Sequence, residues 1–141
     1  MSDPFGLHRF VTAQDGDGTY DQALRELQAG RKHSHWMWFV FPQVEGLGSS
    51  PMAQHYAISG LAEARAYLAH PVLGHRLVEC ARALTALEGT DAVRVFGPVD
   101  AQKLQSSMTL FAQAAPDQPV FRAVLDQYFD GVLDEGTTSR L

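Results

Sequence analysis

The chain has 141 residues, of which 45% are hydrophobic and 19% are charged. A chain of this length can form one domain with its own core. Its apolar content excludes an intrinsically disordered protein, since burial of that surface offsets the entropy lost on folding. The 16 acidic and 11 basic side chains give a formal net charge of -5. We therefore expect no nucleic-acid partner, because binding to a phosphate backbone requires a basic surface.

The sequence also argues against a membrane protein and a secreted one. No run is long and apolar enough to cross a bilayer, so we expect no membrane partner. The first residues lack the basic and apolar regions of a secretory signal, and the single cysteine, Cys80, has no partner for an internal disulfide. We expect a cytoplasmic protein on these grounds.

Helix signals recur along the chain. Capping residues, prolines at first helical positions and apolar residues at helical spacing predict helices over 4–14, 20–29, 35–41, 51–58, 61–69, 71–87, 93–96, 101–114 and 118–129. The run at 35–41 is too short to separate helix from strand, and we interpret it as a short buried helix because no partner strand is indicated elsewhere. Residues 132–141 are predicted to form a tail. The sequence thus predicts a single all-α domain over 1–141, an irregular array of about seven short helices.

The chemically capable side chains are concentrated between residues 31 and 50. The six large apolar residues from Trp36 to Phe41 are expected to belong to the core. Trp36 and Trp38 cannot share one helical face at a spacing of two, so at least one of them must point away from the face that the other buries, where it could form the wall of a pocket. His33 and His35 form an H-x-H pair, but no third ligand is indicated nearby. We therefore predict no metal site; in the simpler interpretation one imidazole caps a helix or forms a local hydrogen bond and the other is half-exposed.

Two further segments allow a functional and a simpler interpretation. The loop from Gly46 to Pro51 leads into a helix and could bind an anion, or it could be a tight turn with a cap at Ser50; it lacks the complete phosphate-loop and dinucleotide patterns. Ser106 and Ser107 lie in a helical stretch, where hydroxyls commonly bond to the carbonyl one turn earlier. They could instead face a pocket beside Lys103. Their order relative to that lysine is the reverse of a Ser-x-x-Lys nucleophile pair.

Several of these motifs together are similar to a known family. They comprise the runs Gly30 to Gln43, Gly46-Leu-Gly48, Ala66 to Leu77, Phe96-Gly97 and Lys103 to Phe111. Over nearly the whole chain this pattern resembles the bacterial and fungal family of domain of unknown function 1810. The resemblance implies a small, mostly α-helical, single-domain cytoplasmic protein, and it implies no particular activity or cofactor. Some members carry a calpastatin label, which we set aside because calpastatin is a disordered repeat protein and this sequence is compact and free of repeats.

Two blocks of polar residues, Lys32 to Ser50 and Lys103 to Thr109, lead to one functional hypothesis. We predict a pocket for a small polar or anionic metabolite between residues 32–50 and the helix at 101–114, without deciding between binding and catalysis. In this pocket His33 or His35 would be the acid, base or hydrogen-bond donor, and Lys32 would contact the negative charge. Trp36 or Trp38 would form a wall, and Gln43, Ser106 and Ser107 would orient the ligand. The alternative is a non-enzymatic protein interaction module, for example a homodimer, whose aromatic segment packs against a partner.

Overall fold

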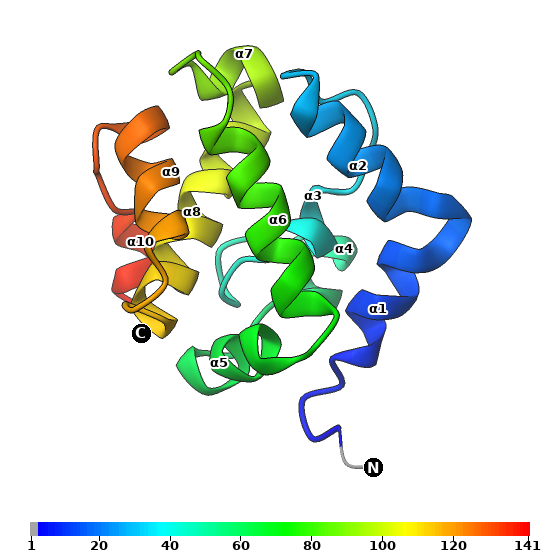
Figure 1. Cartoon of the computed structure of the whole chain (residues 1–141). Helices are drawn as coiled ribbons and strands as arrows, with labels where there is room; N and C mark the ends of the chain where they lie inside the picture. Colours follow the sequence, from blue (N-terminus) through cyan, green and yellow to red (C-terminus); the bar gives the residue numbers. More distant parts are fainter. Residues whose placement is uncertain (1–2) are drawn as a thin grey trace.

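The computed structural model describes residues 3–141, and its regular elements are helices, as predicted (Figure 1). In chain order they are α1 (His8–Asp15), the short 3-10 helix η1 (Gly16–Gly18), α2 (Thr19–Gln28), α3 (Met37–Val40), α4 (Pro51–His55), α5 (Leu61–Ala69), α6 (Leu73–Thr85), α7 (Ala92–Phe96), α8 (Pro98–Ala114), α9 (Pro119–Phe129) and α10 (Glu135–Thr138). They form one compact all-α domain. None of these helices, within residues 3–141, is long and apolar enough to cross a membrane.

Helices α6 and α8 form the centre of the domain. Helix α8 contacts α5, α7, α9 and α10, and α6 contacts α2, α5 and α9. Figure 1 shows α1 and α2 on one side of α6, with α9 and α10 on the other. The apolar stripe of α6 faces the core, since Leu73, Leu77, Cys80 and Leu84 are all buried. The thiol of Cys80 is therefore a core group, and burial raises its pKa to about 12.

A glycine lets α5 and α6 approach closely. A Cβ atom at Gly74 would lie 2.0 Å from the backbone oxygen of Leu68, near the end of α5. Real Cβ atoms do not come so close to a carbonyl oxygen, so any larger residue would push the two helices apart. This contact helps to fix the α5–α6 pair against which α8 packs.

The aromatic segment is helical over a shorter range than predicted. Helix α3 spans Met37–Val40 instead of 35–41, because hydrogen bonds to α2 hold the preceding residues outside the helix and Pro42 follows it. Beyond the proline, Ile58 donates to the Gln43 carbonyl at 2.9 Å, and Glu45 donates to the Ile58 carbonyl at 2.8 Å. This isolated parallel bridge between Val44 and Ile58 fixes the course of the chain after α3.

Both ends of the chain differ from the prediction. Helix α1 begins at His8 instead of residue 4, because Gly6 has a φ of +66° and the Asp3 carboxylate accepts from the amides of Leu7 and His8. The predicted tail at 132–141 contains α10, which packs on α8. Asp134 caps this short helix by accepting from the amide and hydroxyl of Thr137, a fully buried residue. The hydrogen bonds of that cap hold a segment with few apolar residues in place.

Candidate functional site

A buried carboxylate on α2 organises the start of the 31–50 segment. Glu26 is 3% exposed and accepts hydrogen bonds from the amides of His33 and Ser34, at 2.7 and 2.9 Å. It also accepts from the Ser34 hydroxyl, the indole nitrogen of Trp36 and the amide of Gln22. The turn at residues 33–36 is thus fixed mainly through its backbone and through one indole. The motifs of the sequence did not indicate Glu26; the signal that could have done so is an acidic residue on the apolar side of α2, next to Leu27.

These hydrogen bonds keep Glu26 ionised. Burial by itself raises the pKa of this carboxyl group. The bonds donated by Ser34, His33 and Gln22 to the charged form outweigh burial and lower the pKa of Glu26 from its ordinary 4.5 to about 2. The charge is therefore present at neutral pH, and it serves the structure because the donors surrounding it belong to the protein itself.

The two lysines and the two tryptophans of the chain form two pairs joined by Asp100. The ammonium of Lys32 lies 5.0 Å from the centre of a Trp36 ring and 2.9 Å from Asp100 Oδ2. That of Lys103 lies 4.9 Å from the centre of a Trp38 ring and 3.5 Å from Asp100 Oδ1. Cations are attracted to indole faces, so both contacts are favourable. The two sequence blocks therefore meet at the first turn of α8.

The second pair lines an open groove of about 530 Å³. One part of its wall is apolar, formed by Trp38, Leu47, Ala53 and Val99, and the other is polar, formed by Gln43, Ser49, Ser50, Gln102 and Lys103. The groove thus lies between the segment that follows α3 and the first two turns of α8. Its size is in the range of small-molecule sites in other proteins.

Several polar groups in the groove have hydrogen-bonding capacity that the protein does not use. Across residues 3–141, neither the indole nitrogen of Trp38 nor the side-chain amide of Gln43 has a protein hydrogen-bond partner, and both residues are half-buried. The Lys103 ammonium has Asp100 as its ionic partner and can donate three hydrogen bonds in all. Three residues that line the groove, Trp38, Gln43 and Lys103, therefore keep hydrogen-bonding capacity that the protein does not use.

The predicted site residues are divided between this groove and other places. Trp38 and Gln43 line the groove, whereas Lys32 and Trp36 take part in the buried contacts beside it. His33 and His35 are exposed; His35 lies at a separate hollow of about 340 Å³ against α2. The i, i+2 spacing thus separates the two indoles as expected. Within residues 3–141, no cluster of three His, Cys, Asp or Glu side chains has a geometry that could hold a metal ion.

The two serines of α8 lie away from the groove. The hydroxyl of Ser106 lies 3.1 Å from the Gln102 carbonyl, one turn earlier, and 2.8 Å from the Asp134 carboxylate. Its single proton is shared between these two acceptors, so the hydroxyl anchors the C-terminal segment and also contacts the preceding turn, in line with the simpler interpretation. Ser107 is fully buried, and its hydroxyl is the one buried side-chain polar group in residues 3–141 that lacks a partner.

The glycine loop fits the simpler interpretation too. Gly46 has a φ of +95°, and a Cβ at Gly48 would lie 2.6 Å from the Cβ of Ala53. The Ser50 hydroxyl accepts from the Ala53 amide at 3.1 Å, as an N-cap does. The glycines are thus needed for a turn that packs closely, and Ser50 caps the short helix α4. The loop contributes a wall to the groove.

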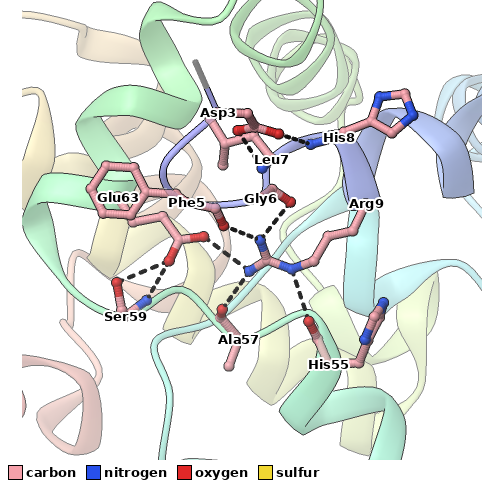
Figure 2. A network of polar contacts seen from close by, with 10 residues as sticks. All are labelled: Asp3, Phe5, Gly6, Leu7, His8, Arg9, His55, Ala57, Ser59 and Glu63. Carbon is pink, nitrogen blue, oxygen red and sulfur yellow. Dashed lines mark hydrogen bonds and ion pairs between the residues drawn. The ribbon is translucent and has the colours of Figure 1, made fainter. Parts of the chain in front are cut away.

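A hydrogen-bond network centred on Arg9 holds residues 55–57, at the end of α4 (Figure 2). All five N–H groups of the Arg9 guanidinium donate within the protein, to the carbonyls of Phe5, Gly6, His55 and Ala57 and to the Glu63 carboxylate at 2.9 Å. The other oxygen of Glu63 accepts from the amide and hydroxyl of Ser59. Arg9 therefore has no donor left for a ligand, and it fixes residues 55–57 next to the bridge that positions Gln43.

The fold and the groove together define the class of protein, a small all-helical domain with a groove lined by unused hydrogen-bond donors beside a lysine. The particular family follows from comparison: the chain belongs to the family described as protein of unknown function (DUF1810), whose sequence model matches residues 4–141. This confirms the resemblance. The chain is 51% identical to the conserved hypothetical protein Rv1873 from Mycobacterium tuberculosis, with 99% of this chain and 98% of that chain covered and a TM-score of 0.95. No curated protein matches it.

Proposed function

We propose that this protein binds a small molecule bearing an anionic group, in the groove between the segment after α3 and the start of α8. The observation that supports the proposal is the meeting of Lys103 with Trp38 and Gln43, two residues with unused donors, from a distant part of the sequence. Folded proteins generally provide hydrogen-bond partners for the polar groups that they partly bury. Three residues with unused donor capacity beside the same groove are therefore suited to a ligand rich in hydrogen-bond acceptors.

The contacts of the other predicted residues limit this proposal. Lys32 and Trp36 are occupied by Asp100 and Glu26, and Ser106 is occupied by Asp134. We therefore place the ligand against Lys103, Gln43 and Trp38 and not against the histidines. The proposal is one of binding, because the groove contains no nucleophile with an adjacent base.

A thermal-shift screen tests this function. We expect at least one anion from a panel of carboxylates, phosphate esters and nucleotides to raise the melting temperature. At one hundred times its dissociation constant, a ligand adds about 2.7 kcal/mol to the free energy of unfolding. Lys103→Met should roughly halve this stabilisation, as a tenfold weaker ligand would, whereas Arg82→Met, which removes a positive charge from the exposed face of α6, should retain it.

Two outcomes would contradict the proposal. One is the absence of a shift with every anion at millimolar concentration. The other is an equal shift in the wild type and in Lys103→Met, which would place binding elsewhere. A melting temperature that depends on protein concentration, with no response to anions, would instead support the interaction module considered from the sequence.

A further inference from the structure

The groove can neutralise one negative charge of a ligand. Two ammonium groups, those of Lys32 and Lys103, share the single carboxylate of Asp100, so the three groups leave a surplus of one positive charge. The ammonium of Lys32 cannot supply it, because its side chain is 8% exposed and donates to the Ser34 carbonyl. The surplus therefore reaches a ligand through Lys103 alone.

A second negative charge would be opposed by Asp100. Its carboxylate lies 3.5 Å from the ammonium that the ligand needs, so a dianion would bring its second charge close to a like charge. Neither Arg9 nor Arg140 lines the groove, so no guanidinium group contacts the second charge there. A monoanion thus fits the groove better than a phosphate monoester, which carries nearly two charges at neutral pH.

The remaining wall favours an apolar body on the same ligand. Val99 is 68% exposed, the highest value among the exposed large apolar side chains of residues 3–141, and it lines the groove with Leu47 and Trp38. A flat hydrocarbon part would cover this surface and remove it from water. Its acidic group could meanwhile accept from Lys103 and from the Gln43 amide, which suits the two oxygens of one carboxylate.

We infer that the ligand is a monocarboxylate with a flat apolar body, and this inference rests on the proposed binding function. Lys103 and Gln43 hold the carboxylate, while Leu47, Val99 and Trp38 cover the body. Asp100, held by Lys32, sets the selectivity against dianions. The ligand class is therefore defined by the charge count at α8 together with the apolar wall.

Nuclear magnetic resonance of the two indole N–H groups can test the inference. The Trp36 indole donates to Glu26 and should report on the fold, whereas the Trp38 indole lies at the groove and should report on binding. The probes are naphthoate, naphthamide, naphthyl phosphate and acetate, each titrated into the full chain near neutral pH. Naphthoate should shift the Trp38 signal with a dissociation constant about tenfold below those of the other three, as expected for one charge-assisted contact joined to apolar burial.

Two variants make the test specific. Lys103→Met should weaken naphthoate about tenfold and leave naphthamide unchanged, since only the carboxylate needs the ammonium. Asp100→Asn should narrow the preference for naphthoate over naphthyl phosphate about threefold or more, because it removes the opposing charge. Unchanged far-ultraviolet circular dichroism in each variant would show that the fold is retained.

The outcomes separate this inference from the proposed function. If naphthyl phosphate binds the wild type as tightly as naphthoate, the monoanion argument is overturned while anion binding stands. If acetate binds as tightly as naphthoate, the apolar body is not recognised and that part of the inference is overturned. An unchanged preference in Asp100→Asn would refute the role of Asp100. If no anion in this panel or in the thermal-shift screen binds, the proposed function itself fails.

Discussion

The two lysine–tryptophan pairs contain the same chemical groups and share one aspartate, yet they differ in what remains available. The Lys32–Trp36 pair is buried: its indole donates to Glu26, and its ammonium is held by Asp100 and a carbonyl. The Lys103–Trp38 pair is half-exposed, and its indole N–H has no protein partner within residues 3–141. The first pair therefore stabilises the fold, while the second retains the capacity to bind.

This difference arises from Glu26 and not from the pairs themselves. Glu26 lies opposite Trp36 and gathers five hydrogen bonds, whereas the indole of Trp38, two residues later, points to the groove. A residue type is thus an incomplete guide to function. What matters is whether the protein already satisfies its polar atoms.

The largest contrast should come from removing each indole. Trp36→Ala should lower the free energy of unfolding by about 4 kcal/mol, because it leaves a cavity and deprives Glu26 of a donor. Trp38→Ala, at a half-buried position, should cost about 1 kcal/mol. Chemical denaturation of both variants measures the difference. Equal losses would show that the two pairs are equally structural and would remove the contrast.

The next largest effect concerns the carboxylate that anchors the buried pair. Because the pKa of Glu26 is lowered in the folded state, its ionisation stabilises the protein above about pH 4.5, and this contribution is lost as the pH falls toward 2. Glu26→Gln should therefore cost about 3 kcal/mol at neutral pH, and the cost should shrink through that acidic range. The exposed Glu88→Gln variant is the control. A cost for Glu26→Gln that does not vary with pH would contradict the ionised anchor.

The smallest contrast should come from the lysines. Lys32→Met should lower the free energy of unfolding by about 2 kcal/mol, since the Asp100 carboxylate loses its closer partner and a carbonyl loses a donor. Lys103→Met should change it by about 0.5 kcal/mol or less, as is usual for an ion pair that is partly exposed to solvent. Thermal and denaturant unfolding of the two variants at matched salt tests this. A larger loss for Lys103→Met would mean that this lysine is structural too.

The fold could be predicted from the sequence wherever the local pattern of apolar residues decided which side chains are buried. The stripe from Leu73 to Leu84 requires a buried face, and five of the six residues from Trp36 to Phe41 are buried as their size suggests. The helix boundaries near residues 4 and 35 could not be predicted. They depend on Asp3, on the backbone of Gly6 and on Glu26, which act through hydrogen bonds between specific atoms. The C-terminal helix depended on the cap at Asp134.

In the candidate site, too, some features followed from local sequence patterns and others depended on the tertiary structure. The sequence by itself determined that Trp36 and Trp38 point in different directions, because a spacing of two separates side chains on a short helix. It also determined that two polar blocks exist. Only the tertiary structure decided that Trp38 faces the groove, that Lys103 meets it, and that His33, His35, Ser106 and Ser107 lie elsewhere. The physical reason is that periodicity fixes directions within an element, whereas meetings between distant elements depend on how their buried surfaces pack together.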